Sequence, residues 1–68
     1  MLNAMTETEE SYHNAYQLLI GATDYDKLAE HEVFYLPENH EDPEVTIRYY
    51  ESIEDYEKCN QIIKSNDI

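Results

Sequence analysis

The single glycine of this 68-residue chain, Gly21, directly follows an apolar stripe with helical spacing. Four residues recur at steps of three and four positions and so share one helical face: Tyr12, Ala15, Tyr16 and Leu19. Glycine readily adopts the left-handed conformation that closes a helix. The pattern therefore predicts a first helix that ends just before Gly21, in a chain that is mainly α-helical.

Capping residues mark the starts of two helices. Thr6 and Glu9 have the spacing of a capping box, which places the start of the first helix near Thr6. The run Asp42-Pro43-Glu44 combines a capping carboxylate, a proline at the first helical position and an acid in the first turn. We expect this helix to run to about Glu51.

Two further helices follow from weaker signals. Thr23 or Asp24 can cap a short helix through about Glu30, with three residues on one side: Tyr25, Leu28 and Ala29. Ser52 and Asp55 repeat the capping pattern, so that the chain either bends into a fourth helix or continues as one long helix. The apolar face of this last helix is Ile53, Tyr56, Cys59, Ile62 and Ile63.

One stretch leaves the fold open between two readings. Residues 33–36 are Val-Phe-Tyr-Leu, a short run of strand-favouring residues that ends at Pro37. Residues 45–50 are also rich in β-branched and aromatic side chains, so the two segments could pair as a β-hairpin. The explicit helix start at Asp42 favours helix for 45–50. The expected fold is a mainly α, small three- to four-helix bundle with an extended segment at 33–36.

Length and cysteine content restrict the class of protein. Residues 1–68 form a single small acidic domain with an ordered core over about residues 6–64. Cys59 has no second cysteine to pair with, which is typical of a reducing compartment. The N-terminal segment has no basic region, and no stretch reaches the roughly 18 apolar residues of a membrane helix. We expect a soluble, cytoplasmic protein.

The charge is the strongest functional signal. Sixteen Asp and Glu oppose four Lys and Arg, which gives a formal net charge of -12. Such a chain repels nucleic acid and anionic membranes and attracts basic protein surfaces. The alternative is that the acids only keep the protein soluble.

Catalytic and metal-site signals are weak. Five residues of types that bind metals lie within positions 31–42: His31, Glu38, His40, Glu41 and Asp42. Their spacing is neither the paired spacing of zinc ligands nor the order of a calcium-binding loop. Cys59 has acidic neighbours and lies on the apolar face, which favours a core position over a nucleophile. There is no glycine-rich phosphate loop. We expect no enzyme activity, no metal and no cofactor.

Seven tyrosines exceed what so small a core can hide. Tyr49 and Tyr50 are adjacent and cannot both point inward from a helix, so some tyrosines should be exposed. Exposed tyrosine among acids is typical of protein interfaces.

The segment Tyr49-Tyr50-Glu51-Ser52-Ile53-Glu54-Asp55-Tyr56-Glu57-Lys58-Cys59, preceded by Phe34-Tyr35-Leu36-Pro37 and Glu41-Asp42-Pro43, resembles the C-terminal half of small acidic proteins of tailed bacteriophages. The resemblance covers about half of the chain. It implies a phage or phage-derived protein that acts on a host protein in the host cytoplasm, and it implies no catalytic residues.

A second resemblance is to the UVR motif, a helical hairpin through which repair and protease-adaptor proteins pair with partners. The order of five residues is similar to its second helix: Tyr56, Glu57, Cys59, Ile62 and Ile63. Lys64 matches the basic residue that follows in the motif. The first helix of the motif is not recognisable in this chain.

Two hypotheses follow. The first is an acidic inhibitor or modulator that occupies a basic surface of a host protein. Where that surface is a nucleic-acid-binding groove, the protein acts as a DNA mimic. Its predicted partner-binding residues are Tyr49, Tyr50, Glu51, Glu54, Asp55 and Glu57. The alternative is a structural or adaptor protein, a homodimer sealed by Ile53, Tyr56 and Ile63.

Overall fold

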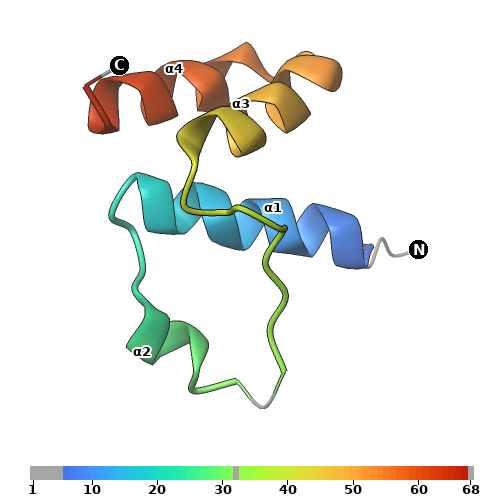
Figure 1. Cartoon of the computed structure of the whole chain (residues 1–68), viewed down its shortest axis with the longest axis vertical. Coiled ribbons are helices and arrows are strands. Elements are labelled where there is room, and N and C mark those ends of the chain that lie inside the picture. The colour runs from blue at the N-terminus through green and yellow to red at the C-terminus, as the bar shows by residue number, and fades with distance from the viewer. Residues whose placement is uncertain (1–5, 32, 68) are drawn as a thin grey trace.

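The residues that the structure describes, 6–31 and 33–67 of this computed structural model, fold into four helices without a strand (Figure 1). The helices are α1 (Glu7–Leu19), α2 (Tyr25–Leu28), α3 (Pro43–Ser52) and α4 (Tyr56–Ser65). The predicted fold class, a small and mainly helical bundle, is therefore confirmed.

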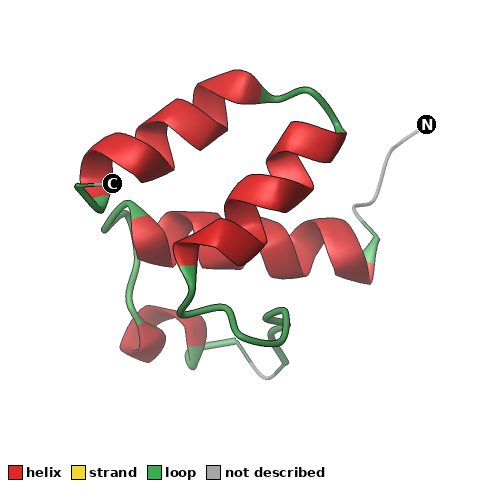
Figure 2. Ribbon diagram, turned by 45° about the horizontal axis from the view of Figure 1, so that its top comes forward, coloured by secondary structure: helices red, strands yellow, loops and turns green. Residues whose placement is uncertain are grey.

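The helices form two groups on either side of α1. α3 and α4 make a helical hairpin that packs on one side of α1, and α2 lies with the loops around it on the opposite side (Figures 1 and 2). The core lies between α1 and the hairpin.

Both predicted ends of α1 are present. The Thr6 hydroxyl accepts a hydrogen bond from the backbone N–H of Glu9 at 3.1 Å, and the Glu9 carboxylate accepts one from the N–H of Thr6 at 3.0 Å. At the other end Gly21 has φ +78°, and the N–H of Ala22 donates to the carbonyl of Gln17 at 2.9 Å. This is the Schellman motif, in which a left-handed residue closes the helix.

The core is centred on three buried residues of the hairpin, Tyr50, Cys59 and Ile62. The predicted stripe of α1 packs against them through Tyr12, Tyr16 and Leu19, together with Ile20, Ile47 and Tyr49. Ala15 of the same stripe is fully buried. Cys59 is thus a core residue, as its place on the apolar face predicts.

The other side of α1 holds the irregular segment in place. The buried side chain of Asn14 donates from Nδ2 to the backbone carbonyl of Tyr35 at 3.0 Å. The Tyr25 hydroxyl forms a hydrogen bond with Nε2 of His40 at 2.9 Å, and Leu28 of α2 is buried. Residues 33–36 belong to neither a helix nor a strand.

The β-hairpin alternative is wrong for residues 45–50, which lie within α3. The Asp42 side chain accepts a hydrogen bond from the N–H of Glu44 at 3.0 Å, and Pro43 occupies the first turn. These start signals outweigh the β-propensity of the residues that follow, because propensity is a weak prior against capping and packing.

α2 ends at Leu28 rather than near Glu30, and of its predicted face Leu28 is buried whereas Tyr25 is exposed. Of the two alternatives for residues 52–55 the structure has the bend: α3 and α4 are separate helices, with Asp55 as the cap of α4. Ile53 and Tyr56 were expected on the buried face, but Ile53 lies at the bend and both are more than half exposed.

Candidate functional site

The turn between α3 and α4 has a defined backbone. The N–H of Glu54 donates to the carbonyl of Glu51 at 3.0 Å, and the N–H of Asp55 donates to the carbonyl of Tyr50 at 2.8 Å. Glu54 has φ +61°, so that it takes the left-handed position of a second Schellman motif. Its side chain is exposed. The turn therefore presents a carboxylate on a hydrogen-bonded scaffold.

The six predicted partner-binding residues fall into three environments. The carboxylates of Glu51, Glu54 and Glu57 are exposed around the turn. Asp55 and Tyr49 are half-buried. Tyr50 is 4% exposed and belongs to the core. Tyr50 therefore packs beneath the surface and offers almost no contact area to a partner.

Tyr49 is held by aromatic contacts. Its ring stacks on Tyr12 of α1 with ring centres 4.1 Å apart and planes 3° apart. It also meets the Tyr50 ring edge-on at 5.0 Å. Burial, and then the nearby Glu9 carboxylate, raise the pKa of Tyr49. Tyr49 thus remains a neutral phenol at physiological pH on a fixed aromatic platform.

Asp55 is engaged within the chain. Its carboxylate accepts a hydrogen bond from the backbone N–H of Lys58 at 3.4 Å and one from Nζ of Lys58 at 2.9 Å. The hydrogen bond from Lys58 lowers the pKa of Asp55, and the same contact raises the pKa of Lys58. Nζ of Lys58 also lies 5.7 Å from the ring centre of Tyr16 and 5.6 Å from that of Tyr50. The Asp55 carboxylate therefore caps α4 and pairs with Lys58 within the chain.

Ile53 and Tyr56 belong to the apolar face predicted for the last helix and, in the homodimer alternative, to the seal between two copies. Ile53 is 54% exposed and Tyr56 is 58% exposed, and they flank Glu54 and Asp55 in the turn. Ile53 is the C-cap of α3, so the bend takes it out of the helical register of Cys59 and Ile62, whereas Tyr56 is the first residue of α4 and lies at the end of that helix. A break signal was present in the cap pattern at Asp55.

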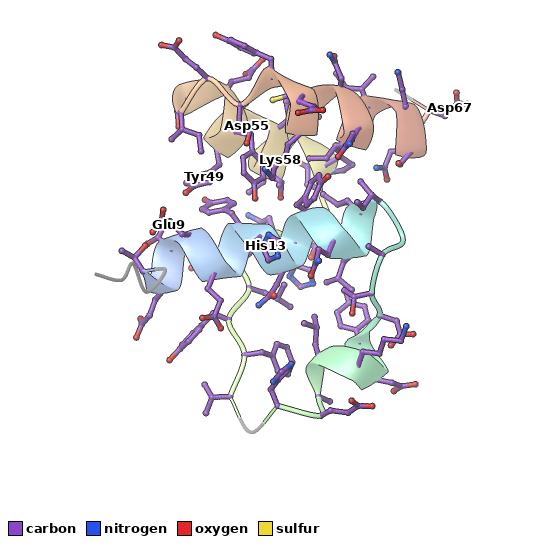
Figure 3. The ribbon with its side chains drawn as sticks, turned by 180° about the vertical axis from the view of Figure 1, so that it is seen from behind. Glu9, His13, Tyr49, Asp55, Lys58 and Asp67 are labelled. Atoms are coloured by element: carbon purple, nitrogen blue, oxygen red, sulfur yellow. The ribbon has the colours of Figure 1, made fainter. Side chains whose placement is uncertain are left out.

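A hollow of about 160 Å³ lies between the N-terminal half of α1 and the α3–α4 junction (Figure 3). Its lining includes Glu9, His13, Tyr49, Ile53, Asp55 and Lys58. Figure 3 shows Glu9 and His13 on α1, with Tyr49, Asp55 and Lys58 of the hairpin on the neighbouring side of that helix. Glu9 and His13 were not predicted as site residues, because about forty positions separate them from Tyr49 and no local pattern links them.

The hollow carries one negative charge more than positive charges when His13 is neutral. Lys58 already balances Asp55, whereas Glu9 forms no ion pair among the described residues. One oxygen of Glu9 accepts the hydrogen bond from Thr6 and fixes the side chain. A cation is therefore the complementary occupant.

The one cysteine and the possible metal ligands of the described residues can be placed individually. Burial raises the pKa of Cys59, which keeps it a thiol, and its Sγ donates to the carbonyl of Ile47 at 3.5 Å. Across residues 6–31 and 33–67, no three His, Cys, Asp or Glu side chains converge as metal ligands would.

Comparison with family models, with curated protein sequences and with solved structures finds no match. Within the described part of the chain, none of the helices combines the length and apolar character needed to cross a membrane.

Proposed function

We propose that this protein is a non-enzymatic acidic binding protein that occupies a basic surface of another protein through its α3–α4 turn. The observation that carries the proposal is the composition of that turn. Two exposed apolar side chains, Ile53 and Tyr56, stand among three exposed carboxylates: Glu51, Glu54 and Glu57.

Such a surface combines the two contributions that a protein interface needs. Apolar and aromatic side chains supply most of the contact free energy when a partner covers them. The carboxylates steer a basic partner towards the turn and exclude acidic ones. The net charge of -12 extends the same attraction over the whole molecule.

The backbone of Glu54 is a second support. A non-glycine residue in the left-handed region costs about 1 kcal/mol, and glycine would avoid that cost. Strained residues are common at binding sites, where the side chain is needed despite the cost. Glu54 fits this pattern, because it has φ +61° and carries an exposed carboxylate at the tip of the hairpin.

The resemblance to small acidic phage proteins suggests the kind of partner. A host protein with a basic surface, such as a nucleic-acid-binding groove, would be blocked by carboxylates that replace phosphates. The protein would then act as an inhibitor or modulator in the host cytoplasm.

The experiment is an affinity capture from bacterial lysate with the tagged protein, followed by purification of the captured partner and measurement of its affinity at two salt concentrations. We expect binding at low salt and its loss at about 1 M salt, where the Debye length is about 3 Å. Binding that does not change with salt would contradict the proposal.

A matched pair of charge variants locates the interface. The test variant replaces three turn carboxylates: Glu51→Gln, Glu54→Gln and Glu57→Gln. The control removes the same number of exposed charges elsewhere: Glu7→Gln, Glu30→Gln and Glu38→Gln. Both variants have the same net charge, so a difference in their affinity reports the position of the removed charges. The test variant should weaken binding at least about tenfold more than the control. Equal effects would assign the attraction to net charge alone and reject the turn as the interface.

A second candidate function, self-association as a structural or adaptor protein, rests on the exposure of Ile53 and Tyr56. Two copies would cover these side chains, but they would also bring together two strongly acidic turns. This candidate predicts a dimer by light scattering that Tyr56→Asp dissociates. A monomer at micromolar concentration rejects it.

A further inference from the structure

We infer that the hollow beside the turn is a socket for one arginine side chain of the basic partner. This inference rests on the proposed function and adds to it the residue type that anchors the complex. The socket is lined by the Glu9 carboxylate, the Tyr49 ring and the exposed Ile53.

The size of the hollow restricts the occupant. The hollow has a volume of about 160 Å³, whereas pockets for small-molecule ligands begin at about 300 Å³. The hollow is therefore too small for a nucleotide or a cofactor. It has the dimensions of a side-chain head group that enters from a partner.

The lining selects a cation. Two carboxylates line the hollow, and among the described residues that of Glu9 forms no ion pair. A hydrogen bond from the N–H of Thr6 fixes its position. The chain itself provides a precedent on the opposite wall, where Lys58 lies between the Asp55 carboxylate and the Tyr16 and Tyr50 rings. A partner cation at Glu9 would repeat this arrangement with the Tyr49 ring.

Arginine fits better than lysine. A guanidinium is planar, donates to a carboxylate from more than one nitrogen and stacks on aromatic rings, and it is less strongly hydrated than an ammonium group. Tyr49 is braced from behind by its stack on Tyr12, so its ring does not have to be ordered on binding. The aliphatic stem of the arginine would lie against Ile53 at the rim.

The test is a titration of the ¹⁵N-labelled full chain with the peptide acetyl-Gly-Arg-Gly-amide, monitored by NMR chemical shifts. We expect saturable shifts at the backbone amides of Glu9, His13, Tyr49 and Ile53, and weaker binding of the otherwise identical lysine peptide. Shifts confined to other regions, equal affinity for the two peptides, or no saturable shift would each overturn the inference.

Two variants with opposite expected effects on the affinity for the arginine peptide make the test specific. Glu9→Gln keeps the capping box, which accepts glutamine, but removes the charge, and it should weaken arginine-peptide binding about tenfold. The matched control Glu7→Gln, on the same helical turn but outside the hollow, should change it less than twofold. Lys58→Met keeps the stem of the side chain and removes the opposing cation, so it should strengthen binding. Equal effects of Glu9→Gln and Glu7→Gln would overturn the socket.

The socket and the proposed function fail in different experiments. If the arginine peptide does not bind while the turn variant still loses the captured partner, the socket is rejected and the acidic interface stands. If the peptide binds in the hollow while the partner ignores the turn charges, the proposed interface is rejected.

Discussion

Gly21 and Glu54 occupy equivalent positions in two Schellman motifs, one at the end of α1 and one at the end of α3. Their φ angles are +78° and +61°. In each motif the following residue donates to the carbonyl four residues before this position, from Ala22 to Gln17 and from Asp55 to Tyr50. The same backbone is therefore built once with the residue best suited to it and once with a charged residue.

This equivalence predicts that Glu54→Gly stabilises the protein. Glycine removes the Cβ strain of the left-handed conformation, and we expect the free energy of unfolding to rise by about 1 kcal/mol. Urea unfolding measures the change. If Glu54 is retained for binding, the same variant should bind the partner less tightly although it is more stable.

Two controls separate strain from charge. Glu54→Gln removes the charge but keeps the strain, so its stability should remain within about 0.5 kcal/mol of the parent protein. Gly21→Ala introduces the strain at the other motif, where an added Cβ meets no atom within 4 Å, and it should destabilise by about 1 kcal/mol. A stabilisation by Glu54→Gln equal to that of Glu54→Gly would mean that charge repulsion, not strain, is relieved.

The environment of Thr46 predicts a second stabilising substitution. Its side chain is fully buried in α3, and its Oγ1 has no hydrogen-bond partner among the described residues. An unpaired buried hydroxyl costs about 1–3 kcal/mol, and valine has nearly the same shape without it. Thr46→Val should therefore raise the free energy of unfolding by about 1 kcal/mol in urea. Thr46→Ala, which removes volume as well, should lower it, and a loss of stability in Thr46→Val would show that the hydroxyl is satisfied in solution.

The sequence predicts the helices better than it predicts the site, for a physical reason. Helix ends depend on nearby residues, such as Thr6 with Glu9 or Asp42 with Pro43, so their spacing in the chain is sufficient. The turn at Glu54 carries no glycine, so its left-handed conformation has no marker in the sequence. The hollow depends on α1 meeting the hairpin, which no local pattern encodes.

Tyr50 predicts a loss of stability at alkaline pH. Burial raises its pKa to about 12, against 10.0 in the unfolded chain. Because the folded-state pKa is the higher one, its contribution is fully present below pH 10 and is lost as the pH rises from about 10 to about 12. The loss amounts to roughly 2–3 kcal/mol at about 1.4 kcal/mol per unit.

Tyr50→Phe isolates this contribution, because it removes the titrating group and keeps the ring. The variant should lose less stability than the parent protein between pH 10 and pH 12, measured by urea unfolding at several pH values. Tyr56→Phe, in which the tyrosine is exposed, should follow the parent curve. Parallel curves for all three proteins would show that Tyr50 is accessible to solvent in the folded state.

Asn14 predicts a local effect on the side of α1 that faces away from the hairpin. Its buried Nδ2 group donates to the carbonyl of Tyr35, a contact that ties the loop between α2 and α3 to α1. Asn14→Ala leaves this carbonyl unpaired, and it should destabilise the protein by about 1–2 kcal/mol. Hydrogen exchange should increase mainly over residues 22–42 and much less in α3 and α4. Gln17→Ala on the same helix serves as the control, and exchange that rises equally throughout the chain would show that the segment unfolds only together with the core.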